Sequence, residues 1–256
     1  MELFDSHLHL DDPAFDPDRS AVLDRARAAG VVAMVTVGTD LESCARVLSL
    51  TGQHEGVFAS VAIHPHEAAR ASEPAMDAIR RMAAHPRVVA IGETGLDLVR
   101  EASPRKTQVT VFRAHIRLAR ERDLPVVIHC REAYPQVLEI LEEEGAERVV
   151  MHAFSGSVET AGRCTDRGYA ISLGGPVTFT KARAALDVAR EAPLDLLLLE
   201  TDSPVLTPEP HRGRRNEPSY LPYIAARIAA VRSMSVDALA SATTANARRV
   251  FRVDQT

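Results

Sequence analysis

The chain has 256 residues, of which 46% are hydrophobic and 25% charged, and its formal net charge is −5 at pH 7. A chain of this size and composition can bury a substantial apolar core, and no low-complexity stretch divides it. The net negative charge excludes a protein that coats nucleic acid through a broad basic face, although it still permits a site that holds a few phosphates locally.

Apolar, β-branched segments alternate with amphipathic segments rich in Ala and Arg along the whole chain. The apolar segments predict strands at residues 3–8, 31–37, 57–63, 88–91, 126–128, 149–151, 169–173 and 196–199. The amphipathic segments predict helices at residues 18–29, 41–51, 73–84, 105–122, 133–144, 158–167, 181–190, 220–231 and 236–250. Eight strands that are each followed by a helix predict an α/β fold, a single-domain TIM (β/α)8 barrel over residues 1–256.

The region after the first predicted strand argues against the main alternative, an open doubly wound sheet. Such a sheet usually carries a Gly-rich phosphate loop at this position, whereas this chain has His7, Leu8 and His9. Further along the chain, Gly30 is placed to end the first helix and Ser235 to begin the last one.

Targeting signals and disulfides are not expected. Acidic residues precede any basic residue at the N-terminus, and no apolar run approaches the roughly 20 residues of a membrane span, so the chain predicts a cytoplasmic protein with neither signal peptide nor anchor. Cys44, Cys130 and Cys164 are odd in number and widely spaced, so we expect small buried hydrophobes rather than a disulfide framework or a CxxC zinc motif.

The first predicted strand contains half of a metal site. His7 and His9 are two residues apart, and in a strand such residues face the same side with their Cα atoms about 6.6 Å apart. Both imidazoles can therefore reach one ion, while Leu8 faces the opposite, packed side. Two histidines near an N-terminus can also be surface residues, so the hypothesis depends on the rest of the chain.

Further candidate ligands follow other predicted strands. They are His64 and His66 after the third strand, Glu93 after the fourth, His129 after the fifth, His152 after the sixth and Asp202 after the eighth. Each one alone is commonly a core or capping residue. Because the carboxyl ends of barrel strands meet at one mouth, we interpret His7, His9, Glu93, His129, His152 and Asp202 as joint metal ligands.

The number of ligands favours two ions. Four histidines and two carboxylates exceed the needs of one tetrahedral ion with an open position, but they suit two ions that share a bridging carboxylate, for which Glu93 is the natural candidate. The only lysines, Lys106 and Lys181, do not follow the fourth or fifth strand, so a carboxylated lysine bridge is not expected.

The sequence resembles the TatD family of metal-dependent deoxyribonucleases over essentially its whole length. The matching motifs are DSHLHL at 5–10, IHPH at 63–66, IGETGLD at 91–97, LPVVIHCREA at 124–133, MHAFSGS at 151–157, LETDSP at 199–204, PHRGRRNEP at 210–218 and TTANA at 243–247.

This resemblance implies a TIM barrel with a binuclear divalent metal centre. By the motif positions, His7, His9 and Asp202 would hold one ion, His129 and His152 the other, and Glu93 would lie between them. The implied activity is hydrolysis of DNA phosphodiesters, as a magnesium-dependent 3′–5′ exonuclease on single-stranded ends. Zinc and manganese are alternative metals, and ligation rich in histidine suits zinc.

The other predicted roles concern proton transfer and substrate. Two ions sharing a water bring its pKa toward 7. Asp202 and Glu93 are the candidate catalytic residues, Asp202 as the group that takes the proton of this water and Glu93 as the bridge. His64, Arg131 and Ser155 are candidate donors to the phosphate. Arg212 and Arg214 lie in a basic run after the eighth strand that could hold a few DNA phosphates, and no protein partner is implied.

Two departures from the family pattern bear on the substrate. Leu98, Val99 and Arg100 stand where family members commonly carry aromatics, so a base-stacking platform is not expected there. His115 stands where Gln is frequent and predicts a structural role. Alternative functions are an amide or ester hydrolase acting on a small substrate or D-aminoacyl-tRNA, and a non-catalytic barrel, which the six filled ligand positions disfavour.

Overall fold

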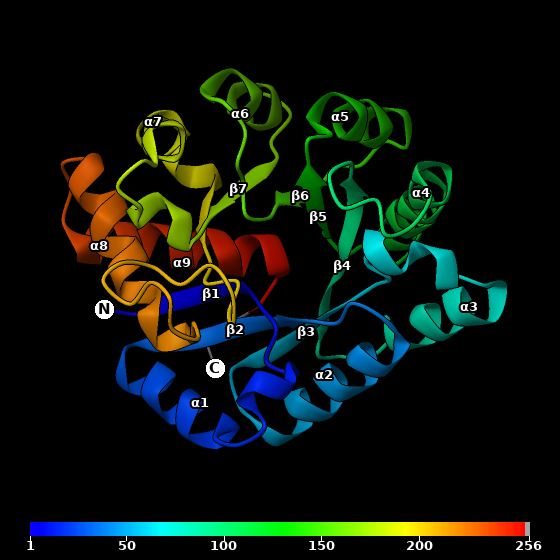
Figure 1. Cartoon of the computed structure of the whole chain (residues 1–256), viewed down its shortest axis with the longest axis horizontal. Coiled ribbons are helices and arrows are strands. Elements are labelled where there is room, and N and C mark those ends of the chain that lie inside the picture. The colour runs from blue at the N-terminus through cyan, green and yellow to red at the C-terminus, as the bar shows by residue number, and fades with distance from the viewer. Residues whose placement is uncertain (254–256) are drawn as a thin grey trace.

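The computed structural model describes residues 1–253, so residues 254–256 of the predicted domain lie outside the described residues. Eight parallel strands form one sheet in the order β1 to β8, and α-helices surround it (Figure 1). The strands are β1 (Leu3–Leu8), β2 (Val31–Val37), β3 (Val57–Val61), β4 (Val88–Asp97), β5 (Val126–Arg131), β6 (Val149–Met151), β7 (Ala170–Leu173) and β8 (Leu197–Leu199). The predicted TIM barrel is confirmed.

The helices follow the strands as the amphipathic segments predict. They are α1 (Arg19–Ala28), α2 (Leu41–Gln53), α3 (Glu73–Met82), α4 (Arg105–Glu121), α5 (Tyr134–Glu143), α6 (Val158–Thr165), α7 (Arg183–Glu191), α8 (Leu221–Val231) and α9 (Val236–Phe251). Short 3₁₀ helices, which the sequence did not predict, lie in the connections at Pro13–Phe15, Pro65–Arg70, Gly175–Thr178, Leu194–Leu196 and Pro218–Tyr220.

Helix ends confirm the local predictions. Gly30 has a φ of +88°, which favours glycine, and directly follows the end of α1. The Ser235 side chain accepts a hydrogen bond from the Ala238 amide and caps α9.

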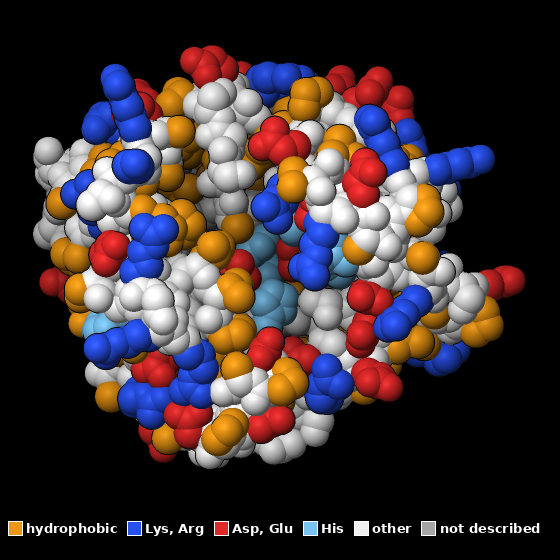
Figure 2. Space-filling view, in the orientation of Figure 1, with side chains coloured by type: hydrophobic (Ala, Val, Ile, Leu, Met, Phe, Trp, Pro, Cys, Tyr) orange, Lys and Arg blue, Asp and Glu red, His pale blue; other side chains and the backbone are white. Residues whose placement is uncertain are grey.

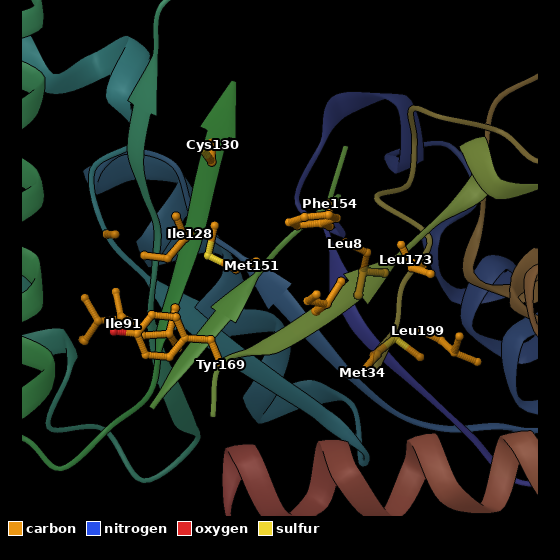
Figure 3. Close-up of a cluster of buried hydrophobic side chains, with 14 of the residues drawn as sticks. Leu8, Met34, Ile91, Ile128, Cys130, Met151, Phe154, Tyr169, Leu173 and Leu199 are labelled. Atoms are coloured by element: carbon orange, nitrogen blue, oxygen red, sulfur yellow. The ribbon is translucent and has the colours of Figure 1, made fainter. Parts of the chain in front are cut away.

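Two layers of apolar side chains hold the barrel together. The larger cluster lies between the strands and the surrounding helices, and Figure 3 shows part of it around Leu8, Ile128, Met151 and Leu173. The second cluster takes at least one residue from every strand, for example Phe4 from β1 and Val127 from β5. Because successive strand residues face opposite sides, this second cluster fills the barrel interior.

Helix α9 closes the barrel at the end opposite the candidate ligands and lies behind the strands in Figure 1. Phe251 of α9 stacks on Phe4 of β1 with ring centroids 5.8 Å apart, and Ala247 joins the same interior cluster. The apolar closure leaves only the other end of the barrel open to polar side chains.

The seam between β1 and β8 is closed by hydrogen bonds at the mouth. The Asp202 amide donates to the His7 carbonyl at 2.9 Å, and the His9 amide donates to the Ser203 carbonyl at 2.8 Å. The Ser6 hydroxyl of β1 also meets the Ser172 hydroxyl of β7, the strand beyond β8, at 2.8 Å. The chain after β8 therefore continues beside β1, so residues about 195 positions apart in sequence become neighbours.

Strand β4 is longer than predicted, and Glu93 lies inside it rather than after it. The prediction ended the strand at Ile91, directly before Gly92, and glycine inside a strand often marks a close approach of another backbone. A Cβ on Gly92 would lie 2.6 Å from Val127, and a Cβ on Gly95, whose φ is +141°, would lie 2.0 Å from the His129 carbonyl oxygen. The glycines therefore permit β4 to approach β5 closely and to continue to Asp97.

Residues predicted to be structural occupy the core. Cys44, Cys130 and Cys164 are buried and free. His115 is buried in α4, where its Nδ1 lies 2.9 Å from the Thr94 hydroxyl and its Nε2 accepts from the Ile63 amide. Within residues 1–253, no helix has both the length and the apolar character needed to cross a membrane.

Asp5 predicts a pH dependence of stability. Burial raises the pKa of Asp5 to about 7, although the Thr201 amide and hydroxyl donate to its carboxyl group. A raised pKa in the folded state favours folding at low pH, and this contribution is lost as the pH rises through about 7. We expect the free energy of unfolding of wild type, relative to Asp5→Asn, to fall by up to about 4 kcal/mol between pH 4 and pH 8.

Urea unfolding of both proteins with chelator present, at several pH values, measures this difference. A difference that does not change with pH would show that Asp5 titrates as an ordinary carboxyl group.

Candidate metal centre

The carboxyl ends of the strands surround a cavity of about 490 Å³. Figure 2 shows histidines at the bottom of a hollow in the middle of this face. The polar side chains that line the cavity include His9, His64, His66, His129, His152, Glu93, Asp202, Arg100 and Arg131. The barrel mouth is therefore rich in nitrogen and carboxylate donors.

The first group of donors comes from the two sides of the β1–β8 seam. His7, His9 and Asp202 each place one donor atom within 4.8 Å of the others. His9 Nε2 lies 3.4 Å from Asp202 Oδ1, and His9 Nδ1 lies 3.1 Å from the Val37 carbonyl oxygen. The Val37 contact turns the Nε2 atom of His9 toward Asp202.

Glu93 lies between two groups of histidines. Its Oε2 atom is 3.4 Å from His7 Nε2 and 3.9 Å from His9 Nε2. Its Oε1 atom is 2.6 Å from His129 Nδ1 and 3.4 Å from His152 Nε2. The two oxygens of one carboxylate therefore face different sets of imidazoles, which is the arrangement of a bridging ligand.

The other five predicted ligands lie around Glu93, but the donors form overlapping groups. His7, Glu93 and His152 make a second set of donor atoms within 4.8 Å, and His64, His66 and His129 make a third. His7 thus belongs to two sets. The assignment of His129 and His152 to one shared ion stays a prediction.

The surroundings of the His7 ring show that these residues suit a metal. Its side chain is only 1% exposed, and both of its ring nitrogens are buried without a hydrogen-bond partner. Its ring stacks on that of His152 with centroids 3.5 Å apart. Buried polar atoms are normally paired, and imidazole and carboxylate donors bind divalent cations well, so the donor set fits a metal ion.

The carboxylates of the site are ionised. Burial would raise the pKa of Glu93, but His152, His64 and His129 together hold the pKa well below the usual range. Burial would likewise raise the pKa of Asp202, and its contacts with His9, His152 and His7 lower that pKa instead. Both carboxylates are therefore available as anionic ligands at neutral pH.

Two of the histidines hold protons strongly when no cation is bound. Burial would lower the pKa of His152, but the charges of Glu200, Glu93 and Asp202 raise it to about 10. Burial would also lower the pKa of His9, but Asp202 and Glu93 raise it to about 9. A cation that binds here must displace these protons.

Glu200 is a functional residue that the sequence reasoning missed. It is fully buried, its Oε2 lies 3.1 Å from His152 Nδ1, and its Oε1 accepts from the Ala153 amide at 2.7 Å. A carboxylate on the second nitrogen of a ligand histidine fixes the orientation of the ring. The available signal was its position two residues before Asp202.

Asp97 is a second missed residue. Its Oδ2 atom lies 2.7 Å from His66 Nε2 and 3.2 Å from His129 Nε2. The Gln108 side chain accepts from the Asp97 amide and so holds this end of β4 against α4. Asp97 therefore orients two imidazoles of the third donor set, and the signal was its place at the end of the IGETGLD motif.

The predicted substrate-binding residues divide into two groups. His64 and Arg131 line the cavity. Ser155 lies outside it and donates its amide hydrogen to the Tyr134 hydroxyl. Arg212 and Arg214 also lie outside the lining, and the Arg212 guanidinium lies over the Phe179 ring at 4.2 Å. Phosphate binding by these three residues stays a prediction.

Comparisons of the sequence and of the structure with known proteins identify the same family. The family model of TatD-related DNases matches residues 4–252. The metal-dependent hydrolase YabD of Bacillus subtilis (strain 168) is 44% identical over 98% of this chain and 100% of its own length. The 3′-5′ ssDNA/RNA exonuclease TatD of Musicola paradisiaca is 39% identical over 99% of both chains. The crystal structure of YjjV, a TatD homologue from Escherichia coli K12, superposes with a TM-score of 0.94 at 32% identity, covering 98% of each chain.

We expect cation binding to release protons. At pH 7 the raised pKa values keep His9 and His152 protonated, so the affinity for a divalent cation should rise as the pH increases toward 9. Titration calorimetry with Mn²⁺, in buffers of different ionisation enthalpy, measures both the affinity and the protons released.

Glu200→Gln is the matched variant, because the change removes a charge that raises the pKa of His152. We expect it to release fewer protons than wild type at pH 8. Equal proton release by the two proteins, or an affinity independent of pH, would contradict the protonation states given above.

Proposed function

The chain belongs to the family of TatD-related DNases and is a metal-dependent hydrolase, and from this premise we propose that it removes nucleotides from the 3′ ends of single-stranded DNA or RNA. The relative from Musicola paradisiaca named for this activity matches this chain over nearly its full length. The observation that carries the proposal is the position of Glu93, with its two oxygens facing different groups of histidines.

Two divalent cations would be held around this carboxylate. His7, His9 and Asp202 would hold one, His129 and His152 the other, and Glu93 would contact both. Bound cations supply positive charge to the phosphate and lower the pKa of water, and magnesium is the proposed metal for activity. The protein contributes fixed donor positions, and Asp97 and Glu200 hold the imidazoles through their second nitrogens.

Asp202 is the proposed proton acceptor. Its carboxylate lines the cavity, is 12% exposed and has a lowered pKa, so it is charged and reachable from the substrate side. The amide of the same residue donates to the His7 carbonyl across the seam, which fixes where the carboxylate lies. A positioned carboxylate can take the proton of an attacking water during phosphodiester hydrolysis.

His64, Arg100 and Arg131 are proposed to orient the phosphate. All three line the cavity, and burial lowers the pKa of His64, so its imidazole is neutral. Arg100 lies three residues after β4 and Arg131 is the last residue of β5, and together they supply positive charge on this side of the mouth. Because only a few cationic groups line the cavity, they suit a substrate that is held by one or two phosphates. Such local contacts are compatible with the negative net charge of the chain.

Asp202→Asn should retain the fold and lose hydrolysis. Residue 202 has a φ of +54°, a conformation that Asn tolerates as well as Asp, so the backbone at the seam should be preserved. Loss of the proton acceptor should reduce kcat by at least about 100-fold at saturating Mg²⁺ or Mn²⁺. Release of 3′-labelled nucleotide measures the rate, and wild-type kcat in this variant would refute the role of Asp202.

A substrate panel tests the proposed function itself. Wild type with Mg²⁺, Mn²⁺ or Zn²⁺ is given 3′-labelled single-stranded DNA and RNA, D-aminoacyl-tRNA and simple esters. We expect the highest kcat/KM on the single strands. Preference for D-aminoacyl-tRNA or for esters would favour the alternative hydrolase, and no activation by any divalent cation would refute the enzyme.

Arg131→Ala should weaken substrate binding. We expect KM for single-stranded DNA to rise, and the slope of log(kcat/KM) against log[salt] to fall by about 0.7, the value for one phosphate contact on a single strand. Arg81→Ala is the control, because Arg81 is exposed on α3. A salt slope identical in wild type and Arg131→Ala would show that Arg131 does not contact a phosphate. A larger change of this slope in Arg212→Ala or Arg214→Ala would place the phosphates at the loop after β8.

A further inference from the structure

We propose that an apolar cavity beside the metal centre binds the nucleobase of the nucleotide being removed. This inference rests on the proposed nuclease function and adds a base-binding subsite to it. The cavity has a volume of about 220 Å³ and lies between the turn after β6 and the first turn of α7. Apolar residues from several elements form its walls, among them Phe154, Leu173, Val177 and Ala185.

The cavity adjoins the metal centre. Ala153 and Leu206 line both cavities, and Ala153 directly follows the candidate ligand His152. Figure 2 shows apolar side chains gathered in a hollow next to the central histidines. A phosphate at the histidines would thus have an apolar recess beside it, on the side of β6 and β7.

Close backbone packing fixes one wall of the recess. A Cβ on Gly175 would lie 1.7 Å from the Leu206 carbonyl oxygen, so only glycine permits the loop after β8 to pack here. The Glu209 amide donates to the Thr178 hydroxyl at 2.8 Å and ties the same loop to the 3₁₀ helix after β7. Leu206 is therefore held at the boundary between the two cavities.

The opposite side is also held in place. The rings of Tyr134 and Phe154 pack with centroids 5.1 Å apart, and the Tyr134 hydroxyl accepts from the Ser155 amide at 2.9 Å. Tyr134 therefore holds the two residues that follow Ala153 in the turn after β6. A recess with fixed walls can bind a flat group without first having to order its own side chains.

The chemistry of the recess suits a nucleobase. Leu206, which lines both cavities, is 36% exposed, and its neighbour Val205, which lines the metal-centre cavity, is 53% exposed. Such aliphatic surface beside a polar site favours contact with an apolar ligand. No acidic side chain is among the residues that line it, within the described part of the chain, whereas Lys181 and Ser155 offer donors at its edge. A base presents two apolar faces and a polar edge, and the neighbouring phosphate is attracted by a lysine.

The residues after Asp97 bear on where at the mouth a base could be bound. Leu98, Val99 and Arg100 follow Asp97, so the chain directly after β4 offers no aromatic ring on which a base could stack. Contact with the base must then come from elsewhere at the mouth. The recess beside β6 and β7 supplies it from another part of the mouth, because β4 is adjacent to β3 and β5 and not to β6 or β7.

Filling the recess tests the inference. Ala184 is an exposed residue of α7 that lines the recess, so Ala184→Phe should fold and occupy part of it, and Ala184→Leu is a smaller change at the same position. Ala226→Phe, at an exposed position in α8 outside the recess, is the matched control. Circular dichroism and thermal unfolding check that each variant is folded.

The measurement is the ratio of kcat/KM for two oligonucleotides, one with a normal 3′-terminal thymidine and one with a tetrahydrofuran abasic residue there. In wild type and Ala226→Phe the ratio should favour the base-bearing strand by about 10-fold, the scale of a single base contact. In Ala184→Phe the ratio should fall toward 1, and in Ala184→Leu it should take an intermediate value.

The outcomes separate this inference from the proposed function. If wild type cleaves neither oligonucleotide with any divalent cation, the proposed function fails. If wild type cleaves both with equal kcat/KM, or if Ala184→Phe keeps the wild-type ratio, the nuclease stands and the base-binding recess is refuted. An equal loss on both strands in Ala184→Phe would also refute it, because the recess would then act on the strand rather than on the base.

Discussion

The hydrogen bonds between the end of β1 and the segment after β8 are the constraint on which the site depends. They close the barrel at its mouth, and they do so through the residues that carry the candidate ligands, since the Asp202 amide binds the His7 carbonyl and the His9 amide binds the Ser203 carbonyl. Asp5 reinforces the seam by accepting from Thr201. Closure of the fold and assembly of the first donor group are thus one event, because the backbone that pairs across the seam cannot shift without moving both imidazoles and the carboxylate.

The second constraint is the balance of charge within the mouth. Two buried carboxylates would be costly alone, and so would a cluster of imidazolium ions, but each lowers the cost of burying the other. Glu93 reaches the centre of the cluster because the glycines of β4 let that strand approach β5. Glu200 contacts His152, and Asp97 contacts His129, and each carboxylate orients the imidazole that it contacts. The cluster leaves His7 with unpaired ring nitrogens, which is the feature that calls for a cation.

The periodic parts of the molecule were predictable from sequence, and the parts set by tertiary approach were not. Eight apolar segments placed the strands, and the rule that strand ends converge placed His7, His129 and Asp202 at one mouth. Glu93 was predicted outside its strand, because the need for Gly92 and Gly95 arises from β5 and is invisible locally. Glu200 and Asp97 were missed since their partners are distant in sequence. The position of the loop that carries Arg212 and Arg214 is set by its contacts with Phe179 and with the 3₁₀ helix after β7. No local sequence pattern indicates these contacts.

The bridging position of Glu93 is tested most directly by anomalous scattering from crystals grown with Mn²⁺ and measured at the manganese absorption edge. Two peaks are predicted, one bounded by His7, His9 and Asp202 and the other by His129 and His152, with the Glu93 carboxylate in contact with both. A single peak, or two peaks of which only one touches Glu93, would contradict the bridging role and with it the proposed two-cation hydrolysis.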